Sequence, residues 1–352
     1  MAGISREEFQ QFYTKEILPL LAPFERKREW LEKFSKLKYV LMGIFAVLIV
    51  IIFSSVPVGM INIFLSAGSG NFKEAFRNAY VSFFVMMIFG LIFILVCGFL
   101  LQYVHQTKKL CQTIKKQLVA KIFSKCGVIL SPNYMQKGIS ISELQRMGIN
   151  LFTSKIDDDI VYGTYNGVNF IINEAFINPE ESVDPRLELY NMKQHKRMLI
   201  VRFDMNKNFK GRTFALCSNF KFKNIGMEEV QLEDIEFMHD KKVYSTDQIE
   251  ARYLFTTAFI DRLKVIEKAF NSSYLQRLGK SKDDLRLNWE LPIGAGFANN
   301  HVYLFITSPV DFFEISLSET LYNIDKYYAV CQQLSAILSI VDVLKLDKKL
   351  GL

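Results

Sequence analysis

Two long apolar runs constrain this chain more than any other feature. They extend over residues 39–65 and 79–104, and neither contains Asp, Glu, Lys, Arg or His. Each run exceeds the roughly 20 residues that a helix needs to cross about 30 Å of hydrocarbon. Core helices of such length in soluble proteins rarely lack a charged face. We therefore predict a two-helix transmembrane hairpin, joined by a polar external loop at 66–78.

The basic residues of the flanks predict how the hairpin is oriented. The formal net charge is +7, and residues 105–126 carry six lysines and no acid. Lysine and arginine beside membrane helices mostly remain on the cytoplasmic side, so both termini are expected there. The bilayer is therefore one expected partner. The candidate contacts to lipid head groups are Lys36, Lys38, Lys108, Lys109, Lys115 and Lys116.

Charge and cysteine usage exclude two classes of function. Residues 127–352 are almost balanced in charge, whereas a nucleic-acid-binding domain would carry its own basic face, so no nucleic acid is expected as a partner. The five cysteines show neither CxxC nor other regular spacing. Such a pattern indicates free thiols in a reducing cytosol and not a disulfide framework or a zinc site.

Helical segments are expected on both sides of the hairpin. Residues 1–38 are predicted to form cytoplasmic helices that Pro19 and Pro23 interrupt, because proline lacks a backbone donor. Residues 105–126 are predicted to continue the second membrane helix as a stalk, with apolar residues every four positions. The apolar face of this stalk needs a partner, and the helix at 24–38 is the nearest candidate, in an antiparallel arrangement.

Residues 127–352 are predicted to form a cytoplasmic α+β domain with a mainly antiparallel sheet. Asn166-Gly167 tolerates the positive φ angles of a type I′ turn, so the flanking runs form a hairpin. Clustered strands without regular helical crossovers favour antiparallel pairing. The strand candidates are 160–164, 168–172, 198–204, 212–217, 228–232, 242–244, 285–291 and 301–307.

Two long helices are expected within this domain. The first begins near Asp247, where Ser245, Asp247 and Glu250 fit a capping box, and its apolar stripe extends to Phe270. The second covers 317–347 and has apolar residues spaced by three and four. This seam either packs on the sheet or mediates self-association, and packing is the commoner use.

Three stretches resemble the signature of a bacterial membrane-protein family called domain of unknown function 3137. They are 204–213 (DMNKNFKGRT), 232–237 (LEDIEF) and 243–253 (VYSTDQIEARY), and the apolar segment 338–346 is also similar to the family. The resemblance implies the same order of parts and a bacterial inner membrane as the location. It implies no activity, because the family has no established catalytic residues.

Residue types that could take part in catalysis or metal binding form no convincing site in the sequence. Consecutive Asp157, Asp158 and Asp159 cannot all face one ion in a regular strand, where side chains alternate, so a solvated turn is favoured. The four histidines lack metal-binding spacing, and the pair Gly294 and Gly296 matches no nucleotide-binding motif. We therefore expect no catalytic residues, no metal and no cofactor.

The favoured function is a membrane-anchored interaction or scaffold module. Its partner would be another protein or a second copy of the chain, because the domain shows no catalytic set and is tethered by a helical stalk. Two alternatives remain open. One is an enzyme acting on lipids or membrane-proximal substrates, which would need a concave pocket with convergent polar groups. The other is a sensor that transmits the state of the membrane through the stalk.

Overall fold

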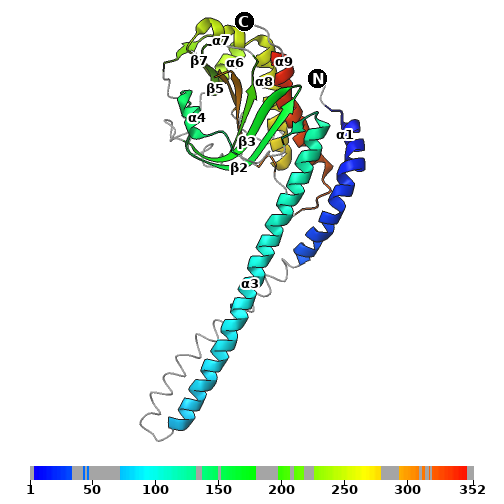
Figure 1. Ribbon diagram of the computed structural model, residues 1–352, viewed down its shortest axis with the longest axis vertical. Helices are drawn as coiled ribbons and strands as arrows, with labels where there is room; N and C mark the ends of the chain where they lie inside the picture. Colours follow the sequence, from blue (N-terminus) through cyan, green and yellow to red (C-terminus); the bar gives the residue numbers. More distant parts are fainter. Residues whose placement is uncertain are drawn as a thin grey trace. The chain divides into compact units, whose positions relative to one another are not determined.

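The computed structural model of the 352-residue chain divides into two compact units (Figure 1). The sheet unit comprises Met1–Ile17, Gln117–Glu314 and Asn323–Leu352, and the helical unit comprises Leu18–Lys116 and Ile315–Tyr322. The first residues therefore cluster with the α+β domain and do not form a separate part with 18–38. The described residues are 4–33, 43, 46, 72–131, 137–149, 152–179, 197–206, 210–217, 226–278, 293–308, 311–313, 317 and 319–346.

A single helix, α3 (Phe72–Lys125), contains both the second predicted membrane run and the predicted stalk. Its 54 residues extend for about 80 Å at 1.5 Å per residue. The helix begins at Phe72, so residues 72–78, predicted as loop, are helical; the first run, 39–65, lies almost entirely outside the described residues. Many large apolar side chains of α3 are exposed: Tyr80, Phe84, Met87, Ile88, Leu91, Ile92, Phe93, Ile94, Leu95, Leu101 and Val104.

Two helices in the described part of the chain are long and apolar enough to cross a membrane. They are Gly90–Lys125, whose apolar window is 0% buried, and Ile324–Leu344, whose window is 67% buried. The second segment is the core helix α9 of the sheet unit. Only the first has the exposed apolar surface that lipid would cover.

The N-terminal helix passes through both prolines without ending. It starts as α1 (Arg6–Phe12) behind a capping box formed by Ser5 and Glu8. A π-helical turn, η1 (Tyr13–Ile17), follows, and residues 18–33 are again α-helical. The predicted interruption at Pro19 and Pro23 is therefore wrong. A π-helical turn is a common local adjustment where the regular hydrogen-bond ladder is disturbed, and this one directly precedes the first proline.

Within the helical unit, the segment before residue 33 contacts α3. The Tyr103 hydroxyl donates a hydrogen bond to the carbonyl oxygen of Leu31 at 3.3 Å, so residues near 31 lie beside the middle of α3 (Figure 1). The stripe that predicted the stalk is covered by its neighbours. Its members Leu110, Ile114, Leu118 and Ile122 are all buried.

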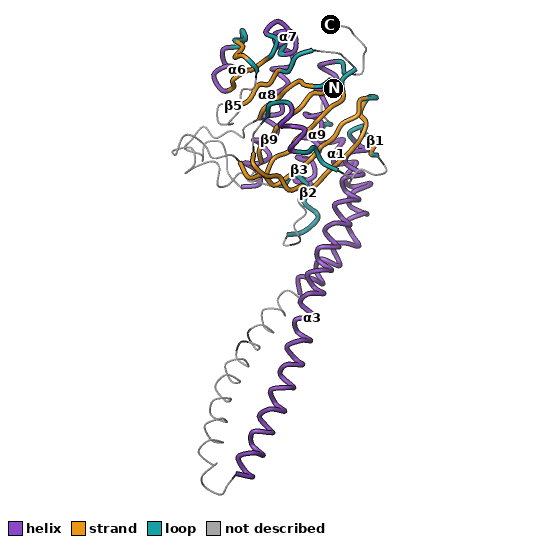
Figure 2. Tube along the Cα trace, turned by 60° about the vertical axis from the view of Figure 1, so that its left-hand side comes forward, coloured by secondary structure: helices purple, strands orange, loops and turns teal. Residues whose placement is uncertain are grey.

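The sheet unit is built on nine described strands, all paired antiparallel (Figure 2). Their order in the sheet is β1-β2-β3-β4-β9-β8-β5-β7-β6. The strands are β1 (Ile129–Leu130), β2 (Phe152–Tyr165), β3 (Val168–Pro179), β4 (Arg197–Asp204), β5 (Thr213–Cys217), β6 (Glu228–Val230), β7 (Lys241–Ser245), β8 (Ile293–Ala298) and β9 (His301–Ser308). The mixed α and antiparallel β character that the sequence predicts is confirmed.

The hairpin that the sequence predicts from a turn between neighbouring strands is present. Asn166 and Gly167 have φ angles of 48° and 78°, and Tyr165 pairs with Val168, as the type I′ turn requires. Strands β4, β5, β6, β7 and β9 lie at predicted positions. Strand β8 was not predicted, and the candidate at 285–291 lies outside the described residues.

Helices cover both faces of the sheet. The short helix α4 (Ile141–Arg146) places Leu144 in a cluster with Ile171 and Phe305 on one face. On the other face, the ring of Phe259 lies 5.2 Å from the ring of Phe297. Phe297 and Ala298 are successive strand residues and point to opposite faces, and Ala298 belongs to the α4 cluster. Phe259 comes from α8 (Thr257–Leu278), which packs along α9.

The helix predicted from Asp247 to Phe270 is two helices. The first, α7 (Gln248–Leu254), ends before Thr256, and α8 begins at Thr257. The Thr256 hydroxyl accepts a hydrogen bond from the amide of Phe259, so a side-chain cap starts the second helix. The predicted stripe is correct in α8 and wrong in α7, where Ile249 and Tyr253 are exposed.

The C-terminal seam packs inside the sheet unit. Helix α9 (Ile324–Leu344) begins behind Asn323, whose side chain accepts a hydrogen bond from the amide of Lys326. Its seam residues Cys331, Leu334, Leu338 and Val341 are at most 2% exposed. These side chains already have partners within the chain, so they are not available for self-association.

Candidate functional site

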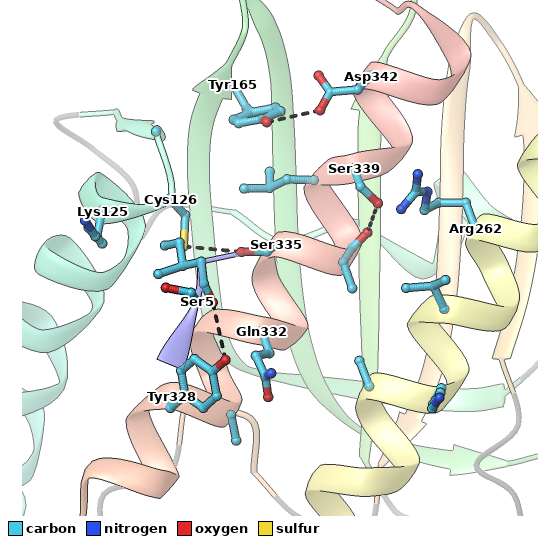
Figure 3. A pocket seen from close by; sticks show the side chains of 18 of the residues that line it. Ser5, Lys125, Cys126, Tyr165, Arg262, Tyr328, Gln332, Ser335, Ser339 and Asp342 are labelled. Carbon is cyan, nitrogen blue, oxygen red and sulfur yellow. Dashed lines mark hydrogen bonds between the residues drawn. The ribbon is translucent and has the colours of Figure 1, made fainter. Parts of the chain in front are cut away.

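A groove of about 770 Å³ lies along α8 and α9 of the sheet unit (Figure 3). We call it the α8–α9 groove. Small side chains on the two helices, including Ala269, Ser272, Ala329 and Ser339, leave this space open. The other lining residues are Ile4, Ser5, Lys125, Cys126, Gly127, Tyr165, Arg262, Val265, Lys268, Tyr328, Gln332, Ser335, Ala336, Leu338 and Asp342.

The end of α3 places Cys126 at the edge of this groove. Gly127 has a φ angle of 79°, which suits glycine. The amide of Val128 donates to the Phe123 carbonyl at 2.9 Å, and the amide of Gly127 donates to the Ser124 carbonyl at 3.0 Å. This pair of bonds is a Schellman motif. It places Cys126 at the C-cap of α3, so the helix ends at Cys126-Gly127.

A second thiol lies behind Cys126, away from the groove. The sulfur of Cys126 lies 3.3 Å from that of Cys331, a residue of α9 that is 0% exposed. A hydrogen bond from Cys331 lowers the pKa of Cys126. The same bond, together with burial, raises the pKa of Cys331. The hydrogen bond thus favours ionisation of Cys126 over ionisation of Cys331.

The acid in the groove is already engaged. The Tyr165 hydroxyl donates to one carboxylate oxygen of Asp342 at 3.3 Å (Figure 3), and the Asn166 amide donates to the other at 2.9 Å. Burial and the negative charge of Asp342 raise the pKa of Tyr165 to about 12. These bonds attach the tip of the β2–β3 hairpin to α9.

Three cationic side chains line the groove, whereas Asp342 is the one acid among its described lining residues. They are Lys125 at the end of α3, and Arg262 and Lys268, two turns apart on α8. The ammonium group of Lys125 lies over the ring of Phe12, 5.7 Å from its centroid. Among the described residues, no ion pair engages Arg262 or Lys268, and both line the groove.

A second polar cluster is formed by the middle of β2 and β3, the start of β4 and Asp311. Oxygen atoms of Asp158, Asp159 and Asp311 all lie within 4.8 Å of one another. The sequence favoured a solvated turn here, but both Asp158 and Asp159 belong to β2, and Asp159 is buried. A bulge between Asp157 and Asp159 breaks the alternation, so neighbouring carboxylates come together.

Arg197 supplies the positive charge of this cluster. Its Nη1 atom lies 2.6 Å from Asp158, 3.4 Å from Glu174 and 3.5 Å from Asp311. The oxygen spacing alone would suit a metal ion, but the guanidinium group already stands in the position of the cation. We therefore interpret the cluster as a structural ion-pair network.

Glu174 is the most perturbed acid in the described chain. It is 1% exposed, and its Oε2 atom has no hydrogen-bond partner. Its Oε1 atom accepts a hydrogen bond from the amide of Phe312 at 3.0 Å. Burial and then the negative charge of Asp311 raise its pKa to about 8, against the opposing effects of the Phe312 amide and Arg197.

The residues that resemble the family signature meet at one end of the sheet. The Glu250 carboxylate accepts hydrogen bonds from the amides of Lys210 and Gly211, at 3.0 and 2.7 Å. The Thr246 hydroxyl accepts another from the amide of Arg212 at 2.8 Å. Segments 210–213 and 245–250 are therefore joined by side chains, which indicates a structural role.

The predicted capping box at α7 is correct only for Asp247. The Asp247 carboxylate accepts from the amides of Ile249 and Glu250, so it caps the helix. Ser245 instead shares a hydrogen bond of 2.7 Å with Thr213 on the paired strand. Glu250 reaches the 210–211 loop, where a Cβ added to Gly211 would lie 2.4 Å from its Oε2 atom. Glycine at this position leaves room for that carboxylate.

The histidines do not gather at one site. His239 bonds to Asp240 at 2.9 Å on the surface, and His301 contacts Asp204 at 3.3 Å across β4 and β9. His105 is exposed on α3, and His195 lies outside the described residues. No described histidine lines the α8–α9 groove.

The helical unit contains a separate groove of about 560 Å³. It lies between residues 24–31 and the part of α3 from Phe99 to Thr113, and Trp30 and Tyr103 provide aromatic walls. Lys27 and Lys109 stand at its edge. Lys108, Lys109 and Lys116 are exposed and Lys115 is partly buried, whereas Lys36 and Lys38 lie outside the described residues.

Comparison with known proteins supports the family resemblance over part of the chain. Residues 199–346 match the family described as protein of unknown function (DUF3137). No curated protein matches the chain. One solved structure is similar, the crystal structure of the mycobacterial trehalose monomycolate transport factor A, TtfA. It has 9% sequence identity and a TM-score of 0.32, and the match covers 65% of this chain and 94% of that one.

Proposed function

We propose that this chain is a bacterial membrane-anchored protein whose sheet unit binds an acidic segment of another protein in the α8–α9 groove. The single observation that carries this proposal is the charge of the groove. Lys125, Arg262 and Lys268 line it, while its one acid is held by Tyr165 and Asn166. Complementary charge favours an acidic partner and disfavours a basic one.

The membrane anchor rests on exposure and charge. The apolar window within Gly90–Lys125 is 0% buried, and water is a poor solvent for such a surface. The lysines that follow it predict that both termini are cytoplasmic and that the loop around 66–71 is external. Lys108, Lys109, Lys115 and Lys116 then contact anionic lipid head groups, each contributing about 1 kcal/mol near the surface. Lys36 and Lys38 join them in the same proposal.

Protease protection tests this orientation. Epitope tags are placed at either terminus or between Ser69 and Gly70, and protease is added to intact spheroplasts and to lysed ones. The terminal tags are expected to survive in intact spheroplasts, whereas the loop tag is cleaved. Cleavage of a terminal tag in intact spheroplasts, or release of the chain by alkaline carbonate, would contradict the anchor as proposed.

Photo-cross-linking from inside the groove tests the partner. A benzophenone amino acid replaces Val265, which lines the groove and is 45% exposed. The double variant Arg262→Glu, Lys268→Glu is expected to lower the cross-linked yield at least about tenfold, because two attractive charges become repulsive. The measurement is the yield of adduct in cells, with the cross-linked segment identified by peptide mass spectrometry.

Matched variants separate groove charge from total charge. The double variant Lys242→Glu, Arg252→Glu changes two exposed basic residues outside the groove, so the net charge of the chain changes by the same amount. Its adduct yield should stay unchanged. A benzophenone at exposed Tyr253 should not give the same adduct. The proposal fails if the captured segment is basic or apolar, or if it belongs to a second copy of this chain.

An enzyme acting on lipids or membrane-proximal substrates is the second candidate. The groove is concave and has polar lining residues, which such an enzyme needs. Its described lining contains no histidine, and Asp342 is engaged by Tyr165 and Asn166. A general base within reach of the Cys126 thiol is thus missing from the described lining, so binding ranks first. A sensor of membrane state is the third candidate, since α3 continues from the apolar run into the sheet unit.

A further inference from the structure

Two cysteines far apart in sequence have their sulfur atoms 3.3 Å apart. Cys126 is the C-cap residue of α3, and Cys331 is the eighth residue of α9. A disulfide bond is about 2.0 Å long, so the sulfurs must approach by only about an ångström. Rotation of the Cys126 side chain at a helix end can provide much of this movement without displacing the core.

The two thiols have different surroundings. Cys126 is partly exposed and lines the groove, whereas Cys331 is 0% exposed. The hydrogen bond from Cys331 lowers the pKa of Cys126, and the charge of Lys125 acts in the same direction. The carboxyl end of a helix disfavours an anion, so the lowered pKa depends on these neighbours and on a hydrogen bond from Ser335. Oxidant arriving through the groove thus meets the more reactive thiol first.

We infer that Cys126 and Cys331 form a redox site that a small hydroperoxide converts to a disulfide, with Cys126 as the attacking thiol and Cys331 as the resolving thiol. The inference rests on the sulfur separation and on the one-sided access from the groove. It does not depend on the proposed acidic partner.

The chemistry balances with hydrogen peroxide as the oxidant. The Cys126 thiolate attacks one peroxide oxygen, the O–O bond breaks, and hydroxide leaves, so Cys126 becomes a sulfenic acid. The Cys331 sulfur then attacks the Cys126 sulfur, an S–S bond forms, and the sulfenic oxygen leaves as water with the Cys331 proton. In total, two thiols and one hydrogen peroxide give one disulfide and two waters. A dithiol reductant reverses the step by thiol–disulfide exchange.

Oxidation would join the end of α3 covalently to α9. The loop closed by this bond contains about 200 residues, so the cross-link should also restrict the unfolded chain. Reduced and oxidised forms should therefore differ in stability as well as in thiol count.

Peptide mass spectrometry of the full chain in detergent tests the site. The reduced protein, with five free thiols, is treated with hydrogen peroxide and the remaining thiols are blocked with N-ethylmaleimide. The expected product is a peptide pair joined through Cys126 and Cys331, with three thiols left for blocking. Dithiothreitol should restore all five.

Variants assign the roles of the two cysteines. Cys331→Ser should leave a sulfenic acid at Cys126 that dimedone traps, whereas Cys126→Ser should leave Cys331 unmodified. Cys111→Ser and Cys217→Ser should form the disulfide as the parent does. Because Cys331 is buried, its variant could unfold, and the peptide map of the parent chain is independent of that outcome. Five blocked thiols after peroxide, or a disulfide involving any other cysteine, would overturn the inference.

Discussion

The sheet unit is expected to lose stability as pH rises. Replacing Glu174 with glutamine is expected to remove this loss. The pKa of Glu174 is about 8 in the folded chain and 4.5 as its ordinary value. Below pH 4.5 the side chain is protonated in both states. Between pH 4.5 and 8 the unfolded chain releases this proton while the folded chain retains it, so the free energy of unfolding falls as pH rises. The fall amounts to about 5 kcal/mol at most, at about 1.4 kcal/mol per pKa unit.

The Glu174→Gln variant should match the parent at pH 4.5 and exceed its stability by several kcal/mol at pH 8. Its amide keeps the size of the side chain and can still accept the hydrogen bond from Phe312. Urea unfolding of the full chain in detergent, followed by near-ultraviolet circular dichroism, measures the difference. Glu229→Gln, at an exposed position of β6, should keep the pH dependence of the parent. A parent whose stability does not fall in this window would disprove the assignment.

Alanine at Gly296 is expected to destabilise the sheet unit by about 3 kcal/mol. Gly296 pairs with Phe214 across β8 and β5, and an added Cβ would lie 1.9 Å from Cδ1 of that ring. The ring is fully buried, so it cannot swing into solvent. Overpacking of a filled core typically costs 1–3 kcal/mol, and a clash with a rigid ring belongs at the upper end.

A double variant shows whether this clash is the cause. Phe214→Leu destabilises on its own but makes room, so Gly296→Ala should cost much less in that background. Gly98→Ala is the matched control, because nothing lies within 4 Å of its added Cβ. Thermal unfolding of the full chain in detergent provides the midpoints of the parent and the four variants. Additive effects of the two core changes would rule out direct contact as the explanation.

Features governed by near neighbours in sequence were predictable. Asn166-Gly167 specifies its turn through backbone preferences, and the spacing of Leu334, Leu338 and Val341 specifies a buried helix face. The end of α3 at Cys126-Gly127 follows from the conformational freedom of one glycine. In each case the interaction that decides the structure joins residues within a few positions.

Features that depend on distant partners were not predictable. Strand β8 has the sequence IGAGFA, whose glycines resemble those of a loop. The reason for Gly296 is that Phe214 lies across from it. The bulge that brings Asp158 to Asp159 follows from pairing with β3 and not from local composition.

The α8–α9 groove was missed for the same reason. Cys126 and Cys331 are 205 residues apart, and their spacing carries no signal. The only local hint was that Cys331 belongs to a seam whose other members are apolar.

The strand order also has a consequence for synthesis of the chain on the ribosome. The open edge of β4 is completed only by β9, whose first paired residue follows Asp204 by nearly 100 positions. At a synthesis rate of about 5–20 residues per second, β9 is made roughly 5–20 s after β4, and the edge of β4 stays unpaired for that time. Strands β1 to β4 therefore exist for a time as a half-sheet with an unpaired, apolar border on β4. Nascent chains of this protein should depend on a holding chaperone during that interval.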